Sequence, residues 1–157
     1  MTSGEKDTEV RKTRPKIKTP FKCFLYETKG KTDIPVFIDE DGHYIYEGRG
    51  QVIGEFVCDY IKCIPPEMFV VKEDAESVLQ GSCLTPKEAK EYAGWKPGAY
   101  LSECKDLYGW HISDLVIYDK PKELSEFLVD GNQTYDCPQL TPLKRPPQSW
   151  CYVEVVA

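Results

Sequence analysis

The sequence is poor in the features that mark membrane and secreted proteins. None of its apolar runs reaches about 18 residues, the shortest run typical of a membrane-spanning helix. Residues 1–6 are polar and do not resemble the start of a secretory signal peptide. We therefore expect a cytoplasmic protein that does not enter a membrane.

The sequence also lacks the cysteine and histidine spacing of a zinc site. It has only two histidines and seven cysteines, an odd number that argues against a disulfide framework. Cys58 and Cys63 are separated by four residues, and no second pair or nearby histidine accompanies them. We expect no metal and no cofactor, and we expect Cys23, Cys58, Cys63 and Cys151 to be small core residues.

Positive charge is scarce overall but concentrated near the amino end. The net charge is −6, which argues against non-specific binding of nucleic acid. Residues 1–31 nevertheless hold nine basic and four acidic side chains, whereas the rest of the chain holds eleven basic and twenty-two acidic side chains. Residues 11–18, with Arg14 and Lys16 among them, thus form a positive stripe that can contact phosphates. The alternative is a basic arm that only keeps the protein soluble.

The hydrophobic pattern predicts mainly strands. Thr85, Pro86 and Glu88 together form the start signal of a helix, which we expect to end at Gly94. We predict one α+β domain over residues 1–157, a small β-barrel of about five to six strands with one or two short helices. The expected strands cover residues 8–12, 21–27, 34–38, 43–46, 51–64, 108–118 and 149–155.

The string Gly4-x-Lys6-x-x-Glu9-x-Arg11 is the most informative feature of the chain. In an extended segment Glu9 and Arg11 project from the same face, and Gly4 permits a turn that brings Lys6 back over that face. Two cations and one carboxylate would then form a pocket for a ligand with an anionic group and N–H donors, such as a nucleotide. The alternative is a solvated edge strand with surface ion pairs.

This string resembles the signature of the ASCH domain, a branch of the PUA-like superfamily of small β-barrels. Further segments resemble strands of phage and prophage members in the same order, namely residues 8–16, 20–22, 108–115, 119–121 and 147–152. The resemblance implies a barrel whose cleft is lined by Lys6, Glu9 and Arg11 and binds RNA or a nucleotide.

One departure from the family concerns the amino end. ASCH proteins open with a strand and a short helix before the motif, whereas three residues precede Gly4 here. The resemblance therefore implies an exposed strand edge through which copies or partners pair. A poorly folding, truncated gene product is a further alternative.

A hydrolase is the alternative from another functional class. Some ASCH-related enzymes deacylate modified cytidine nucleosides with a lysine at the position of Lys6 and a threonine three residues later. Glu9 takes the place of that threonine here, and Thr8 is expected to point away from Lys6. The deacylation mechanism is not expected to apply, but Lys6 and Glu9 could still act as an acid–base pair on a modified nucleoside or RNA.

Three ring side chains complete the candidate set. Trp110 and Trp150 are candidates for stacking on a base, with a core position as the alternative. His111 shares a strand face with Ser113 and is a candidate for the site because histidine can act near neutral pH. It lacks an evident acidic partner, and the alternative is a buried histidine with a structural role. The predicted ligand-binding residues are thus Lys6, Glu9, Arg11, Arg14, Lys16, Trp110, His111 and Trp150.

Overall fold

The chain folds into two compact units that are described separately. The computed structural model describes residues 6–28, 37–38, 40–42, 44–45, 50–130 and 139–155. Unit 1 comprises Met1–Cys23 and Phe56–Leu115, and unit 2 comprises Phe24–Glu55 and Val116–Ala157. The assignment of the whole chain to one domain stays a prediction.

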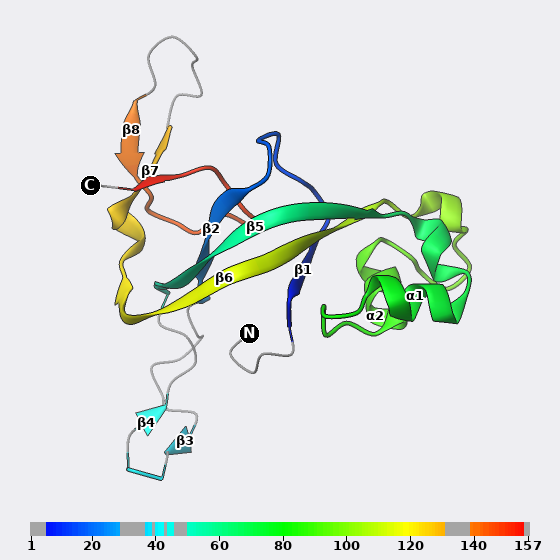
Figure 1. Cartoon of the computed structure of the whole chain (residues 1–157), viewed down its shortest axis with the longest axis horizontal. Helices are drawn as coiled ribbons and strands as arrows, with labels where there is room; N and C mark the ends of the chain where they lie inside the picture. Colours follow the sequence, from blue (N-terminus) through cyan, green and yellow to red (C-terminus); the bar gives the residue numbers. More distant parts are fainter. Residues whose placement is uncertain are drawn as a thin grey trace. The chain divides into compact units, whose positions relative to one another are not determined.

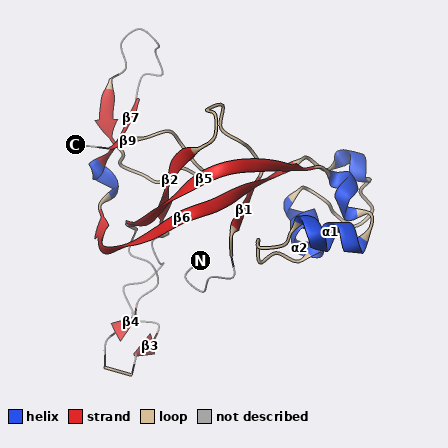
Figure 2. Cartoon of the chain, in the orientation of Figure 1, coloured by secondary structure: helices blue, strands red, loops and turns tan. Residues whose placement is uncertain are grey.

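The described elements confirm an α+β fold made of antiparallel sheets and two helices (Figures 1 and 2). The two α-helices are α1 (Lys72–Val78) and α2 (Pro86–Tyr92), and short 3₁₀ turns lie at Pro66–Phe69, Leu101–Glu103 and Leu124–Glu126. The strands are β1 (Thr8–Arg11), β2 (Phe21–Tyr26), β3 (Phe37–Ile38), β4 (Tyr44–Ile45), β5 (Val52–Ile64), β6 (Leu107–Lys122), β7 (Phe127–Asp130), β8 (Leu140–Pro142) and β9 (Glu154–Val155).

The described strands form three sheets, and none of these closes into a barrel. The largest has the order β1-β6-β5-β2, β7 lies between β8 and β9, and β3 pairs with β4 as the predicted hairpin. One outer edge of the largest sheet is β1. A loop lies along the start of this edge, because the N–H groups of Asp7 and Thr8 both donate to the carbonyl of Gly81. The loop therefore covers the start of this edge.

The core of unit 1 lies between the sheet and the two helices. Val10 from β1 packs with Ile64 from β5 and Leu107 from β6, and the remaining buried members come from the helical region: Leu79, Ala89 and Ala93. Burial of Val10 fixes β1 through its inward face, so that the side chains on either side of Val10 in sequence point the other way.

The sequence contains a start signal for one of the two helices but not for the other. α2 begins as predicted, because the Thr85 hydroxyl accepts from the Glu88 N–H while the Glu88 carboxylate accepts from the Thr85 N–H. Gly94 follows it with a φ of +107°. The sequence analysis missed α1, which begins after Val71, a residue without a capping side chain.

Unit 2 is organised around Phe127 at the start of β7. Its ring is buried and meets Phe24 edge-on, with a centroid distance of 4.8 Å. The carbonyl of Phe127 accepts from the Leu143 N–H. At Gly54 a Cβ atom would lie 2.4 Å from the Val116 carbonyl oxygen, so glycine permits a close approach of strands here.

The cysteines only partly follow the prediction of a core role. Cys58 is buried and Cys23 half-buried, and burial raises the pKa of Cys23 to about 12 and that of Cys58 to about 11. Cys63 and Cys151 are exposed, so the core prediction is wrong for them. Cys63 precedes the buried Ile64 in β5, so strand alternation turns its side chain to the opposite, exposed side, and Cys151 lies outside the strands, before β9.

The described residues contain neither a metal-binding cluster nor a membrane-spanning helix. No group of three or more histidine, cysteine, aspartate or glutamate side chains there is arranged to hold a metal ion. Among the same residues, every helix is too short or too polar to cross a membrane.

Candidate functional site

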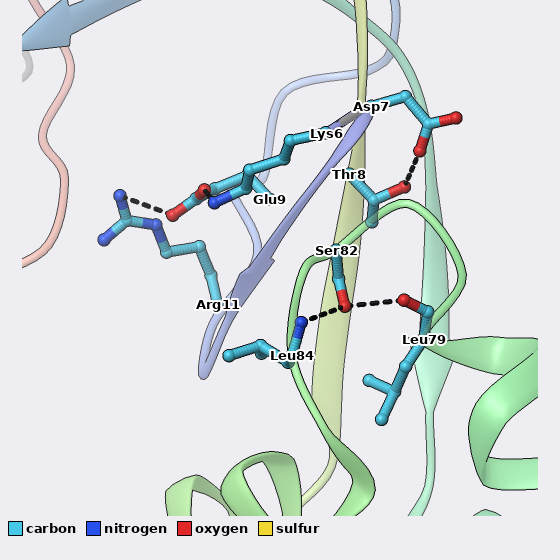
Figure 3. A network of polar contacts seen from close by, with 8 residues as sticks. All are labelled: Lys6, Asp7, Thr8, Glu9, Arg11, Leu79, Ser82 and Leu84. Atoms are coloured by element: carbon cyan, nitrogen blue, oxygen red, sulfur yellow. Dashed lines mark hydrogen bonds and ion pairs between the residues drawn. The ribbon is translucent and has the colours of Figure 1, made fainter. Parts of the chain in front are cut away.

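The three charged side chains of the amino-terminal motif meet at one point of unit 1. Lys6 Nζ lies 2.6 Å from Glu9 Oε2, and Arg11 Nη2 lies 3.0 Å from Glu9 Oε1. Figure 3 shows the carboxylate between the guanidinium and the ammonium group. Their exposed fractions are 24% for Lys6, 17% for Glu9 and 34% for Arg11, so none extends freely into solvent. The predicted convergence of these side chains is confirmed.

Strand alternation in β1 produces this convergence. Glu9 pairs with Trp110 and Arg11 with Tyr108 in the antiparallel register with β6. Thr8 and Val10 are buried on the opposite face, as the period of two requires. Thr8 donates from its hydroxyl to the Asp7 carboxylate and so is directed away from Lys6, as predicted.

A loop between the helices fixes the start of β1. The carbonyl of Gly81 in this loop accepts from the Asp7 and Thr8 N–H groups. Ser82 holds the loop in shape, because its buried hydroxyl donates to the Leu79 carbonyl at 2.6 Å and accepts from the Leu84 N–H (Figure 3). Gly81 has a φ of +80°, and its Cα lies directly against the Asp7 carboxylate. The segment that carries Lys6 is therefore positioned by residues 79–84.

The charged trio lines a pocket of about 420 Å³. This volume falls in the range of roughly 300–1,000 Å³ that small-molecule sites occupy. The resemblance implied a cleft inside a barrel, whereas the second wall comes from the 79–84 loop and α2. The lining residues are Lys6, Glu9, Val10, Arg11, Ser82, Leu84, Glu88 and Tyr92.

The charges that line the pocket are balanced. Lys6 and Arg11 oppose Glu9 and Glu88, and both cations already contact Glu9. Hydrogen bonds from the Thr85 backbone and side chain hold the pKa of Glu88 below its ordinary value. The pocket is thus not a simple anion site, because each incoming negative charge meets two carboxylates as well as two cations.

Glu9 keeps unused capacity to accept hydrogen bonds. Its Oε2 atom is buried and makes the ion pair with Lys6, but the angles of that contact are not those of a hydrogen bond, and Oε2 has no other partner among the described residues. An ionised carboxylate offers about four acceptor positions. Because Oε2 is buried, a ligand would use the positions that remain on Oε1, and Glu9 can accept there while it stays between the two cations.

His111 has an acidic partner that the sequence analysis missed. His111 Nδ1 lies 2.6 Å from Asp59 Oδ1, and the imidazole stacks on the Tyr60 ring at 4.5 Å with an interplanar angle of 12°. Partial desolvation alone would raise the pKa of Asp59. Hydrogen bonds from His111 and from the backbone, together with the charge of His111, have the larger effect, so the pKa of Asp59 is lower than its ordinary value. The only sequence signal was an aspartate within a strand of mostly apolar residues.

The pair predicts a stability change at acid pH. Because the pKa of Asp59 is lower in the folded chain than in the unfolded chain, ionised Asp59 stabilises the fold, and this contribution disappears as the pH falls below about 4. We expect wild type to be more stable than Asp59→Asn at pH 7 and the difference to shrink toward pH 3, measured by urea unfolding. The exposed Asp119→Asn variant is the control, and a difference independent of pH contradicts the assignment.

The remaining candidates are placed apart from the pocket lining. Trp110 is buried, meets the Phe21 ring edge-on and donates from Nε1 to the Thr13 carbonyl, which favours the core alternative. Arg14 and Lys16 are exposed. Trp150 belongs to unit 2, precedes β9 and meets the Tyr152 ring edge-on at 5.3 Å. Their roles in binding stay predictions, as do those of the pocket residues.

Comparison with known protein families found no match, and comparison with curated proteins found none either. The resemblance to the ASCH domain therefore depends on the motif and on the segments that accompany it.

Proposed function

We propose that the chain is an ASCH-like, PUA-like domain whose unit 1 pocket binds a nucleotide or a segment of RNA. The observation that carries the proposal is the convergence of Lys6, Glu9 and Arg11 at a pocket that also has an aromatic wall. A nucleotide combines a flat ring, N–H donors and an anion, and these features match the wall, the carboxylate and the cations in turn.

The positive stripe gives this proposal its electrostatic component. Residues 11–18 follow the pocket motif directly, and Arg14 and Lys16 in this segment are exposed. Phosphates that flank a bound nucleotide would contact the stripe, which adds affinity without sequence preference.

RNA binding is expected to depend on Arg11. Binding can be measured by fluorescence anisotropy with a labelled single-stranded RNA of mixed sequence. Arg11→Ala should weaken this binding at least about tenfold, because a charge-assisted hydrogen bond is lost. Neutralising Arg14 should reduce the slope of the logarithm of the binding constant against the logarithm of the salt concentration by about one unit. Arg145→Ala, which removes an exposed arginine in unit 2, is the matched control and should have little effect.

The proposal is wrong if the wild-type chain binds neither RNA nor nucleotides at low salt. The same samples test the hydrolase alternative, because turnover of a modified nucleoside or RNA that disappears in Lys6→Ala would show that the site is catalytic.

A further inference from the structure

The order of charged groups along the pocket wall is donor, acceptor, donor. The ammonium of Lys6 lies on one side of the Glu9 carboxylate, and the guanidinium of Arg11 lies on the other (Figure 3). An ammonium has three N–H donors and a guanidinium five, so each keeps donors after its contact with Glu9. The wall thus offers a fixed row of three hydrogen-bonding groups to a ligand.

The two carboxylate oxygens differ in how a ligand can reach them. Oε2 is buried beside the Lys6 ammonium, whereas Oε1 lies on the Arg11 side of a side chain that keeps 17% of its surface exposed. A ligand donor therefore reaches the carboxylate at Oε1, with one cation on either side. One donor of the ligand can be accepted there, but a second adjacent donor would need Oε2.

The complement of this row is acceptor, donor, acceptor, which is the edge of an imide. We infer that the pocket recognises a planar imide, in nucleic acid the O4, N3–H and O2 edge of uracil. N3–H would donate to Glu9 Oε1, and the two carbonyl oxygens would accept from Arg11 and Lys6 in place of the anion, which residues 12–18 of the positive stripe would then contact. This inference rests on the proposed function and narrows it to one kind of base.

The apolar and aromatic lining residues suit the faces of such a ring. Leu84 and Val10 contribute apolar surface, and Tyr92 contributes an aromatic ring whose centroid lies 4.6 Å from Lys12 Nζ. Lys12 itself does not line the pocket. Aromatic side chains that line a site can stack on any base, and selection among bases is left to the polar row.

Other bases match the row less well. Cytosine presents one donor followed by two acceptors, so at best two of its groups pair and either Lys6 or Arg11 gains no hydrogen bond from the base. Guanine presents two adjacent donors, the second of which would need the buried Oε2. Each pairing that the ligand does not make forgoes one hydrogen bond to a charged group, which corresponds to roughly tenfold to hundredfold in affinity.

The test uses nucleosides, because they carry no phosphate and isolate recognition of the base. Uridine, 3-methyluridine, cytidine and guanosine are titrated into the whole chain, with binding followed by NMR shifts of the backbone amides. We expect uridine to bind at least about tenfold more tightly than each of the other three. The comparison with 3-methyluridine is the most direct, because the methyl group replaces only the N–H that faces Glu9.

Glu9→Gln is the matched variant, because it keeps the shape of the side chain while its amide can donate as well as accept. We expect the preference for uridine over cytidine to fall to about threefold or less, with thermal unfolding measured to show that the variant is folded. Glu126→Gln, an exposed change in unit 2, should leave the preference unchanged.

Each outcome decides the inference. Equal binding of uridine and 3-methyluridine, tighter binding of cytidine or guanosine, or a uridine preference that survives Glu9→Gln would overturn it. Binding of RNA without measurable binding of any nucleoside would also overturn it but leave the proposed function intact. If neither RNA nor nucleosides bind, the proposed function fails as well.

Discussion

Replacing Gly81 with alanine is expected to lower the free energy of unfolding by about 2–4 kcal/mol, since positive φ and a steric clash both oppose the new side chain. A Cβ atom at this position would lie 1.8 Å from Asp7 Oδ1, at a φ of +80°. Either the Asp7 carboxylate turns away and loses the hydrogen bond from the Thr8 hydroxyl, or the loop moves away from β1 and the bonds from the Asp7 and Thr8 N–H groups to the Gly81 carbonyl break. Because Lys6 precedes these residues, ligand binding at the pocket should weaken together with stability.

Gly98→Ala is the matched control for this change. Gly98 has a φ of +85°, but no atom lies within 4 Å of the position of its Cβ, so this variant bears the backbone strain without the clash. We expect it to lose about 1 kcal/mol and to keep ligand binding. Adding Asp7→Ala to Gly81→Ala should restore part of the lost stability. Equal effects of the two glycine variants in urea unfolding would show that the loop does not press against Asp7.

Truncation of Ile64 is expected to have a similar or larger effect on stability. The side chain is fully buried in the core of unit 1, next to Val10, which holds β1 in place. Ile64→Ala should cost about 2–5 kcal/mol, because it removes apolar contacts and leaves a cavity beneath the helices, whereas Ile64→Val should cost only about 0.5–1.5 kcal/mol.

The Ile64 series can be checked by urea unfolding at constant pH. A graded loss from isoleucine through valine to alanine, with an unchanged dependence on urea concentration, supports a tightly packed core. If Ile64→Ala costs less than about 1 kcal/mol, the packing between β5 and the two helices differs from the one described.

The sequence was most informative where the relevant contacts are local. The convergence of Lys6, Glu9 and Arg11 follows from strand alternation over a few residues, and the start of α2 follows from a capping box within one turn. Such features depend on backbone geometry that neighbouring residues fix, so they can be predicted without knowledge of the fold.

The features that were missed depend on contacts between distant segments. Asp59 and His111 are 52 residues apart, and only the register of two strands brings them together. The second wall of the pocket comes from α2 and the loop before it, which no spacing near Lys6 could indicate. α1 was missed for a local reason, because Val71 at its start provides no capping signal.

The most direct measurement is a crystal structure of the chain with a bound uridine nucleotide. The account predicts electron density for the base between the Lys6–Glu9–Arg11 row and the wall formed by Leu84 and Tyr92, with N3 within hydrogen-bonding distance of the Glu9 carboxylate. Density at another surface of the chain, with this pocket unchanged at saturating nucleotide, would contradict it.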